Sequence, residues 1–249
     1  NNLNGNYNSP YWLKDKLEKS DINSISLIVD ITNYILLEQG QPLHAFDKDK
    51  LCKLTGKNVE PNDFGIRSAN DKEIFVGIDG NKYELNKNIT LITCCDKPVA
   101  IAGVIGSLDS CVSNSTTSIF LEAAVFNPVL VRKSSKEIGL RTESSSRFEK
   151  GISYKNTINS VKRTLTLLSN LFNNDYKYDI YSSKVIFEDT NLIKLRRNRI
   201  HKLLGPIVNK NIKEELKNIS IKRNISDAEI KEKLEFIGCS IYATNYGWD

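Results

Sequence analysis

Apolar and polar residues alternate with a period of two between Phe64 and Glu122, and this pattern limits the fold more than any other feature of the chain. Such alternation is typical of strands that bury one face. Within it, the Asp79-Gly80 dipeptide is typical of a tight hairpin turn. Strands are therefore predicted over residues 74–78, 83–85, 89–95, 99–104 and 118–124.

Helix signals flank this stretch on both sides. Ser9 and Pro10 suit the N-cap and the first position of a short amphipathic helix. The apolar run over residues 27–37 is interpreted as a second helix, which Gly40 ends, and a third is expected within residues 127–139. A long fourth helix is predicted from apolar residues at spacings of three and four, namely Ile158, Val161, Leu165, Leu168 and Phe172. Together these signals predict an α+β fold, with an antiparallel or mixed sheet as the core and helices packed on it.

Three segments are distinguished along the chain. The first domain covers residues 1–172, and a polar stretch without periodicity makes residues 173–185 the predicted linker. A small helix-rich α+β module follows over residues 186–249. Its basic run, residues 194–202, is interpreted as a solvated helix face, with a nucleic-acid stripe as the alternative. The helices predicted in this module cover residues 195–204, residues 212–216 and a segment that Ser226 and Glu229 begin as a capping box.

Composition excludes several classes of protein. The chain has 249 residues, 40% of them hydrophobic, and can bury a large core, which excludes an intrinsically disordered chain. No apolar stretch is long enough to cross a bilayer and no secretory leader is recognisable, so the cytoplasm or an organelle interior is expected. The 5 cysteines lack the paired spacing of metal ligands, and the chain has only 2 histidines, so no metal site is predicted. The cysteines are interpreted as reduced thiols, most of them buried in strands. The absence of methionine predicts an internal piece of a longer polypeptide.

Three places invite a functional interpretation on local grounds. His44 follows a corner that Pro42 fixes, and it is either a hydrogen-bonded core histidine or a site residue. Glu122 lies in an apolar strand, where a glutamate either faces a pocket or pairs with a cation such as Arg147. The polar run over residues 139–151 is either a functional loop or a solvated loop whose hydroxyls cap the next helix.

Four segments, in this order, resemble the β subunits of bacterial-type phenylalanine-tRNA ligases: VDITNYILLEQGQPLHAFD, AIAGVIGS, IFLEAAVFNP and GLRTESSSRFEKGI. The resemblance implies that residues 1–172 form a B3/4-type editing domain, which hydrolyses tyrosine wrongly attached to phenylalanine tRNA. Residues 186–249 resemble, more weakly, the beginning of the B5 module that follows, truncated at its C-terminal end. The resemblance also implies an α subunit that carries aminoacylation, an α2β2 assembly, and ATP and magnesium for the whole ligase. It implies no cofactor, metal or membrane contact for this part.

The resemblance also implies roles for individual residues. Glu122 matches the residue that reads the tyrosine hydroxyl, and an editing site of this kind is needed because an apolar synthetic pocket rejects an added hydroxyl poorly. His44 and Thr142 match catalytic editing residues, and Gly106 matches a glycine of the pocket wall. Asn23 and Ser144 match two further substrate-binding positions.

Two of these matches depart from the family pattern, since Asn23 stands where arginine is usual and Ser144 where alanine is usual. Ser107 and Ser146 are smaller departures, from glycine and histidine. These changes leave open the alternative of an editing-silent module that only positions the α subunit and the tRNA. A free-standing protein that clears mischarged tRNA is a third possibility, against which the missing methionine argues.

Overall fold

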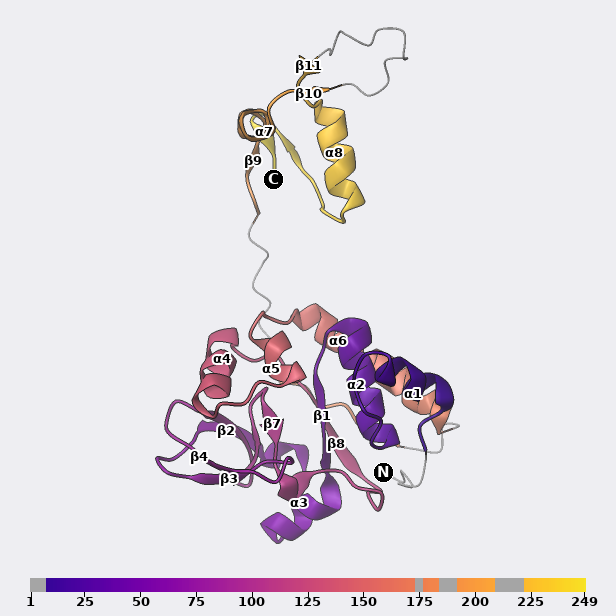
Figure 1. The fold of residues 1–249 in the computed structure, drawn as a ribbon, viewed down its shortest axis with the longest axis vertical. Helices are drawn as coiled ribbons and strands as arrows, with labels where there is room; N and C mark the ends of the chain where they lie inside the picture. The colour runs from indigo at the N-terminus through magenta and orange to yellow at the C-terminus, as the bar shows by residue number, and fades with distance from the viewer. Residues whose placement is uncertain (1–7, 173–176, 184–191, 209–221) are drawn as a thin grey trace. The chain divides into compact units, whose positions relative to one another are not determined.

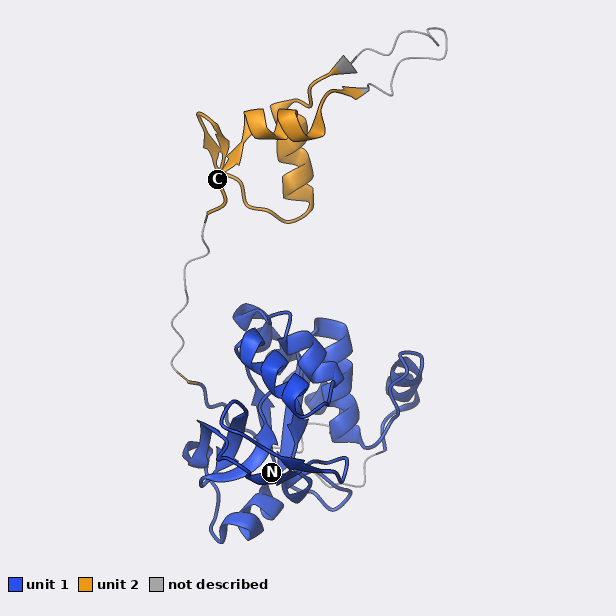
Figure 2. Cartoon of the chain, turned by 60° about the vertical axis from the view of Figure 1, so that its left-hand side comes forward, with its two compact units in different colours: residues 1–182 blue, residues 183–249 orange. Residues whose placement is uncertain are grey.

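The computed structural model describes residues 8–172, 177–183, 192–208 and 222–249. It divides into two compact units, residues 1–182 and residues 183–249, which Figure 2 distinguishes by colour. Of the predicted linker, residues 173–185, the stretches 173–176 and 184–185 lie outside the described residues. Residues 212–216, for which a helix was expected, lie outside them entirely. Among the described residues, no helix is long and apolar enough to cross a membrane.

Unit 1 contains helices and antiparallel strands (Figure 1), which confirms the predicted α+β class. Asp47, the last residue of β1, also caps α3, because its carboxylate accepts a hydrogen bond from the backbone N–H of Lys50. The helices are α1 (Tyr11–Glu18), α2 (Leu27–Gln39), α3 (Lys48–Thr55), α4 (Pro128–Glu137), α5 (Glu143–Phe148) and α6 (Tyr154–Leu171). Two short 3-10 helices, η1 (Pro61–Asp63) and η2 (Leu108–Ser110), lie between strands.

The strands of unit 1 form three separate antiparallel groups rather than one sheet. The first is a two-stranded ribbon of β1 (Leu43–Asp47) and β8 (Ile119–Ala123). The second has the order β2-β5-β6-β7, from β2 (Phe64–Ser68), β5 (Thr90–Cys94), β6 (Lys97–Ile101) and β7 (Ile105–Gly106). The third is the predicted hairpin, β3 (Ile74–Val76) with β4 (Lys82–Glu84).

The strand predicted over residues 99–104 is wrong at its end. β6 stops at Ile101, because Gly103 adopts a left-handed backbone, with φ of 70°, and turns the chain into β7. The surroundings of Gly103 also disfavour a side chain, since an added Cβ would lie 3.0 Å from atoms of Phe126 and Val131, which would have to shift. A glycine therefore separates two short strands where the sequence pattern suggested one long strand.

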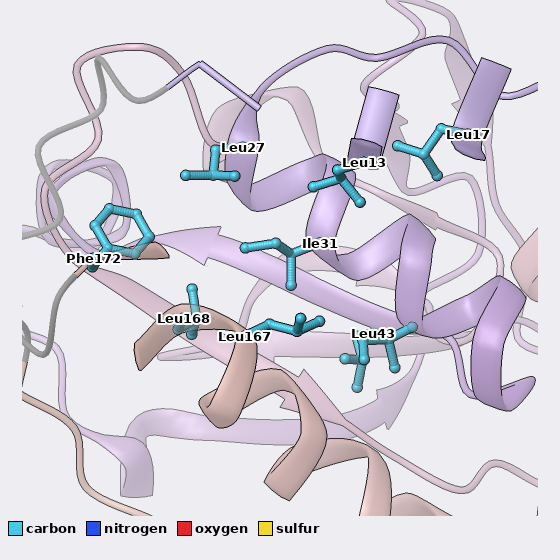
Figure 3. Close-up of a cluster of buried hydrophobic side chains, with 9 residues drawn as sticks. Leu13, Leu17, Leu27, Ile31, Leu43, Leu167, Leu168 and Phe172 are labelled. Atoms are coloured by element: carbon cyan, nitrogen blue, oxygen red, sulfur yellow. The ribbon is translucent and has the colours of Figure 1, made fainter. Parts of the chain in front are cut away.

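The ribbon β1–β8 separates two hydrophobic clusters. Leu43, Leu121 and Ala123 contact the cluster formed with α1, α2 and α6, and Figure 3 shows Leu43 facing side chains of those helices. Phe46 and Phe120 contact a different cluster, which contains residues of α3, β5 and β6. Because successive side chains of a strand point to opposite faces, His44 and Glu122 lie on the same face as Phe46 and Phe120.

Two helix predictions need correction. Ser9 does not cap α1, which has Pro10 at its N-cap; the Ser9 hydroxyl donates instead to the buried carboxylate of Asp30. The apolar stripe predicted on the long helix fails in its first half, because Ile158 is 40% exposed. The buried residues of that half of α6 are polar, namely Thr157 and Ser160, and Thr164 is buried four residues further along.

Unit 2 contains two helices and short antiparallel strands among its described residues. The predicted first helix begins two residues late, at Arg197, because Leu195–Arg196 pairs with the last strand, and the capping box at Ser226 is confirmed. Its elements are β9 (Leu195–Arg196), α7 (Arg197–Leu204), β10 (Ile207–Val208), β11 (Lys222–Arg223), α8 (Asp227–Phe236), β12 (Ala243–Thr244) and β13 (Gly247–Trp248).

In the basic run of unit 2, Arg197 differs from its neighbours because it contacts other side chains of the unit. The Arg197 guanidinium pairs with the Asp227 carboxylate at 2.6 Å and lies over the Trp248 ring, 5.5 Å from its centroid. Lys194, Arg196, Arg199 and Lys202 are exposed, as a solvated face requires.

Candidate functional site

His44 lies in β1, and one of its ring nitrogens is unpaired within the part of the chain that the structure describes. Its Nε2 atom is buried and has no hydrogen-bond partner among the described residues. Burial lowers the pKa of the imidazole to about 4, so the ring is neutral at physiological pH. A core histidine would satisfy this nitrogen with a backbone group. The structure therefore favours the second interpretation, a ring nitrogen available to a ligand.

Glu122 is the direct cross-strand neighbour of His44 in the β1–β8 register. Side chains at such positions leave the ribbon on one face, with Cβ atoms about 4.5–5.5 Å apart. Withdrawal from water raises the pKa of the Glu122 carboxyl to about 7, and no charged neighbour offsets that effect. Arg147 pairs with Glu143 at 2.6 Å and not with Glu122. The ion pair considered from the sequence is thus absent, and the pocket alternative remains.

The raised pKa of Glu122 predicts a dependence of stability on pH. Between about pH 4.5 and 7 the folded chain retains a proton that the unfolded chain has released, so the free energy of unfolding falls as pH rises. A shift of this size corresponds to about 3 kcal/mol. The glutamine of Glu122→Gln cannot titrate. As the pH rises from about 4 to 8, the free energy of unfolding of this variant should therefore increase by about 3 kcal/mol relative to that of the original chain.

Urea unfolding of both proteins across this pH range measures the difference. His44, with its pKa lowered to about 4, contributes stability that increases with pH over the range from about 4 to 6.5. That contribution is present in both proteins, so the comparison isolates Glu122. A difference between the proteins that does not change with pH would contradict an ionisable, desolvated Glu122.

Gly106 lies directly against the His44 ring. A Cβ added at Gly106 would be 2.4 Å from Cε1 and 2.5 Å from Nε2 of that ring. No larger residue can occupy the position unless His44 moves. The structure therefore joins Gly106, His44 and Glu122, which stand far apart in the sequence, in one place.

Gly106→Ala is expected to displace the His44 ring and to cost about 2 kcal/mol of unfolding free energy, as overpacking of a filled site usually does. Urea unfolding measures the cost, and the NMR signals of the His44 ring report its displacement. Gly65→Ala is the matched control, because its Cβ would meet only the Thr93 hydroxyl, at 3.3 Å. Equal costs for the two variants would show that the His44 ring does not depend on the space left by Gly106.

Thr142 is the N-cap of α5 and is attached to the same region. Its hydroxyl accepts from the backbone N–H of Ser145 at 3.1 Å and donates to the backbone carbonyl of Val104 at 2.9 Å. The capping role considered from the sequence is therefore formed. The bond to Val104 also ties α5 to the turn that leads into Gly106. A hydroxyl oxygen has two lone pairs, so one more hydrogen bond can be accepted there.

The remaining two candidate positions differ in their surroundings. Ser144 lies in the first turn of α5, two residues after Thr142, and is partly buried. Asn23 is exposed in the loop between α1 and α2, and no interaction connects it with the other candidate residues in the described part of the chain. The structure therefore brings together His44, Glu122 and Gly106, attaches Thr142 and Ser144 through α5, and leaves Asn23 apart.

A row of aromatic rings beside His44 was missed in the sequence. The Phe46 ring meets the His44 ring edge-on, with centroids 4.6 Å apart, and Phe64 then bridges Phe46 and Phe120 at 5.6 and 5.1 Å. Phe46 and Phe120 are cross-strand neighbours, one pair removed from His44 and Glu122. The period of two in LHAFD was a signal for Phe46, but nothing local pointed to Phe64.

In the described residues, no cluster of three or more His, Cys, Asp or Glu side chains could hold a metal ion. All 5 cysteines are free thiols, of which Cys94 is buried in β5 and Cys239 is exposed. The expectation that most of them lie buried in strands is wrong, since Cys52 lies in α3 and Cys111 follows a 3-10 helix.

Comparison with known proteins shows the family. The model of the B3/4 domain matches residues 1–173, more than half of the chain. The chain belongs to the B3/4 domain family. The matched segment contains every candidate site residue, from Asn23 to Ser144, so the arrangement around His44 and Glu122 is a feature of a B3/4 domain.

The B3/4 domain and the residues after it are also similar to curated proteins over 99% of the chain. The chain is 60% identical to the phenylalanine--tRNA ligase beta subunit of Prochlorococcus marinus (strain MIT 9312) and 42% identical to that of Synechococcus sp. (strain CC9605). These matches confirm the resemblance found in the sequence. The chain covers 29% of the length of each of these two relatives.

Proposed function

We propose that this chain is part of the β subunit of a phenylalanine-tRNA ligase, and that its B3/4 domain hydrolyses tyrosine wrongly attached to phenylalanine tRNA. The first part is supported by the similarity of the chain to phenylalanine-tRNA ligase β subunits. The observation that carries the second is the position of Glu122 and His44 as cross-strand neighbours on one face of the ribbon. Nε2 of His44 is buried without a hydrogen-bond partner among the described residues, and burial raises the pKa of Glu122. A buried polar atom without a hydrogen-bond partner is suited to bind a ligand that supplies the missing hydrogen bond.

Glu122 would distinguish tyrosine from phenylalanine. A carboxylate in a dry site accepts a strong hydrogen bond from a phenol hydroxyl. A phenylalanine side chain would leave the same carboxylate desolvated and unpaired, which costs free energy. The pKa near 7 keeps a substantial ionised fraction at neutral pH. The aromatic row of Phe46, Phe64 and Phe120 beside the pair would give one wall of this site an apolar character.

His44 would act at the other end of the substrate, near the ester. Hydrolysis forms a bond from the water oxygen to the carbonyl carbon, breaks the bond from that carbon to the ribose oxygen, and leaves the water proton on the ribose. The neutral imidazole can orient the water or the ester through Nε2. The Thr142 hydroxyl, which is bonded to the Val104 carbonyl, offers a further acceptor. Ser144 would contact the substrate in the first turn of α5, and Asn23 would do so only from the separate loop between α1 and α2. A terminal ribose hydroxyl can assist removal of the proton.

In the whole ligase, an α subunit would carry aminoacylation in an α2β2 assembly, in the cytoplasm or an organelle interior. ATP and magnesium would serve that reaction outside this chain. The ester hydrolysis proposed for the B3/4 domain consumes only water and would need neither of them.

Single-turnover hydrolysis of preformed tyrosyl-tRNA for phenylalanine, by the complete two-subunit ligase, tests the proposal. We expect release of tyrosine well above the rate without enzyme, and much slower release from phenylalanyl-tRNA. The alternative is an editing-silent domain that positions the α subunit and the tRNA. It is supported by the isolation of Asn23 and by the serine at position 144, where the family usually has alanine. Release of tyrosine at the uncatalysed rate would favour that alternative.

A further inference from the structure

A polar seam joins the start of β1 to α6. We define it as the side chains of Gln39, Gln41, Asn156, Thr157 and Ser160. Asn156 donates to the Gln39 carbonyl at 2.7 Å, and the Ser160 hydroxyl donates to the Gln39 amide oxygen at 2.8 Å. The Thr157 hydroxyl donates to the amide oxygen of Gln41 at 2.7 Å. This seam takes the place of the apolar stripe that the sequence predicted on the first half of α6.

Gln41 is the buried centre of the seam, with no exposed surface. Its amide nitrogen donates to the Pro42 carbonyl at 3.0 Å and to the Ala124 carbonyl at 3.1 Å. One side chain therefore connects the start of β1, the residue after β8, and α6 through Thr157. The donors and the acceptor of the amide are all used, which holds its orientation.

The ladder of β1 and β8 explains why this side chain is needed. The last pair of the ladder at this end is Leu43 with Ala123, so the next residues outward are Pro42 and Ala124. Proline has no backbone N–H and cannot extend the ladder. The Gln41 side chain supplies the donor that Pro42 lacks and bonds the Ala124 carbonyl. His44 and Glu122 form the second pair from this end, where a two-stranded ribbon would otherwise fray.

We infer that Gln41, held by Thr157, is the positioning residue that closes this end of the ribbon and keeps His44 beside Glu122. The hydrogen bonds of its side chain go to Pro42, Ala124 and Thr157 and not to His44 or Glu122, so its effect passes through the β1–β8 ladder. The inference rests on the proposed function for its catalytic consequence. Its structural consequence, protection of the ladder end, can be measured without any activity.

Two variants interrupt the seam and one matched variant does not. Gln41→Met keeps the approximate size of the side chain and removes its amide, and Thr157→Val removes the hydroxyl that holds that amide. Thr164→Val is the control, because Thr164 is equally buried on α6 and its hydroxyl donates only to the Ser160 carbonyl of the same helix. Thr157→Ser keeps the donor and should restore the behaviour of the original protein.

Hydrogen exchange in the complete ligase is the first measurement. We expect amides of residues 43–47 and 119–123 to exchange about 10-fold faster in Gln41→Met and Thr157→Val. This factor corresponds to an increase of about 10-fold in the equilibrium constant for local opening of the ladder. The β2–β5 ladder should exchange at its original rate, and so should both ladders in Thr164→Val and Thr157→Ser. Unchanged exchange of the ribbon in Gln41→Met and Thr157→Val would overturn the inference.

Hydrolysis of tyrosyl-tRNA is the second measurement. The same two variants should lower kcat about 10-fold with KM changed less than about 2-fold, as expected for a misplaced catalytic pair. Thr157→Ser and Thr164→Val should keep the original kcat. If the ligase hydrolyses no tyrosyl-tRNA at all, the proposed function fails and the exchange result still decides the role of Gln41. If exchange changes in an active ligase and kcat does not, the positioning role is overturned.

Discussion

Glu122→Ala is expected to lower single-turnover hydrolysis of tyrosyl-tRNA by about 10³-fold, equivalent to about 4 kcal/mol of transition-state stabilisation. The carboxylate is the group that would bond the tyrosine hydroxyl, and sites built to bond a hydroxyl lose discrimination steeply without it. Its position in the second pair of the ribbon and its pKa near 7 support this role. Rapid-quench measurement of tyrosine release from the complete ligase gives the rate.

Two controls separate loss of recognition from loss of folding. Glu122→Gln keeps the size of the side chain and an oxygen that accepts hydrogen bonds. Its rate of tyrosine release should therefore fall less, by about 10-fold, because a neutral acceptor replaces a charged one. Aminoacylation with phenylalanine should stay at its original rate in both variants. If Glu122→Ala releases tyrosine as fast as the original ligase, Glu122 does not read the hydroxyl.

Asp30→Ala is expected to cost about 4 kcal/mol of unfolding free energy, the largest effect on stability among single changes considered for this chain. Asp30 is fully buried in α2. Its carboxylate accepts from the hydroxyls of Ser9 and Ser24, both at 2.5 Å, and from the backbone N–H of Ile25 at 2.8 Å. Alanine leaves these donors without their acceptor and frees the segment before α1 from α2.

Urea unfolding of the chain measures this cost, with Asp15→Ala as the matched control. Asp15 lies in α1 and pairs with Lys19, whose side chain is 73% exposed. Exposed pairs of this kind contribute less than about 1 kcal/mol. Equal losses in the two variants would contradict the importance given to the buried bonds of Asp30.

Much of the fold could be predicted because local signals were strong. Asp79-Gly80 formed its hairpin, Gly40 ended α2 with φ of 69°, and Ser226 with Glu229 capped α8. Each of these depends on residues within a few positions of one another. His44 and Glu122 were also recognisable as unusual, since a lone histidine after proline and a glutamate in an apolar strand stand out locally.

The remaining features depend on contacts between distant segments. Ser9 suited an N-cap, but it is drawn to Asp30, 21 positions away. Ile158 suited a buried stripe, but the surface that α6 meets is the turn at Gln39 and Gln41, which is polar and requires donors. The nearness of Gly106 to His44 depends on the packing of β7 against the ribbon, for which no spacing in the sequence is a signal.

The two faces of the β1–β8 ribbon have a consequence for how this domain can change in evolution. One face carries Leu43 and Leu121 into the helical core, and the other carries His44 and Glu122. Insertion or deletion of one residue within either strand would exchange the two faces. A polar side chain of the site, His44 or Glu122, would then point into the helical core and would be lost from the site. Lineages of this domain should therefore vary in length in their surface loops and accept only substitutions in these two strands.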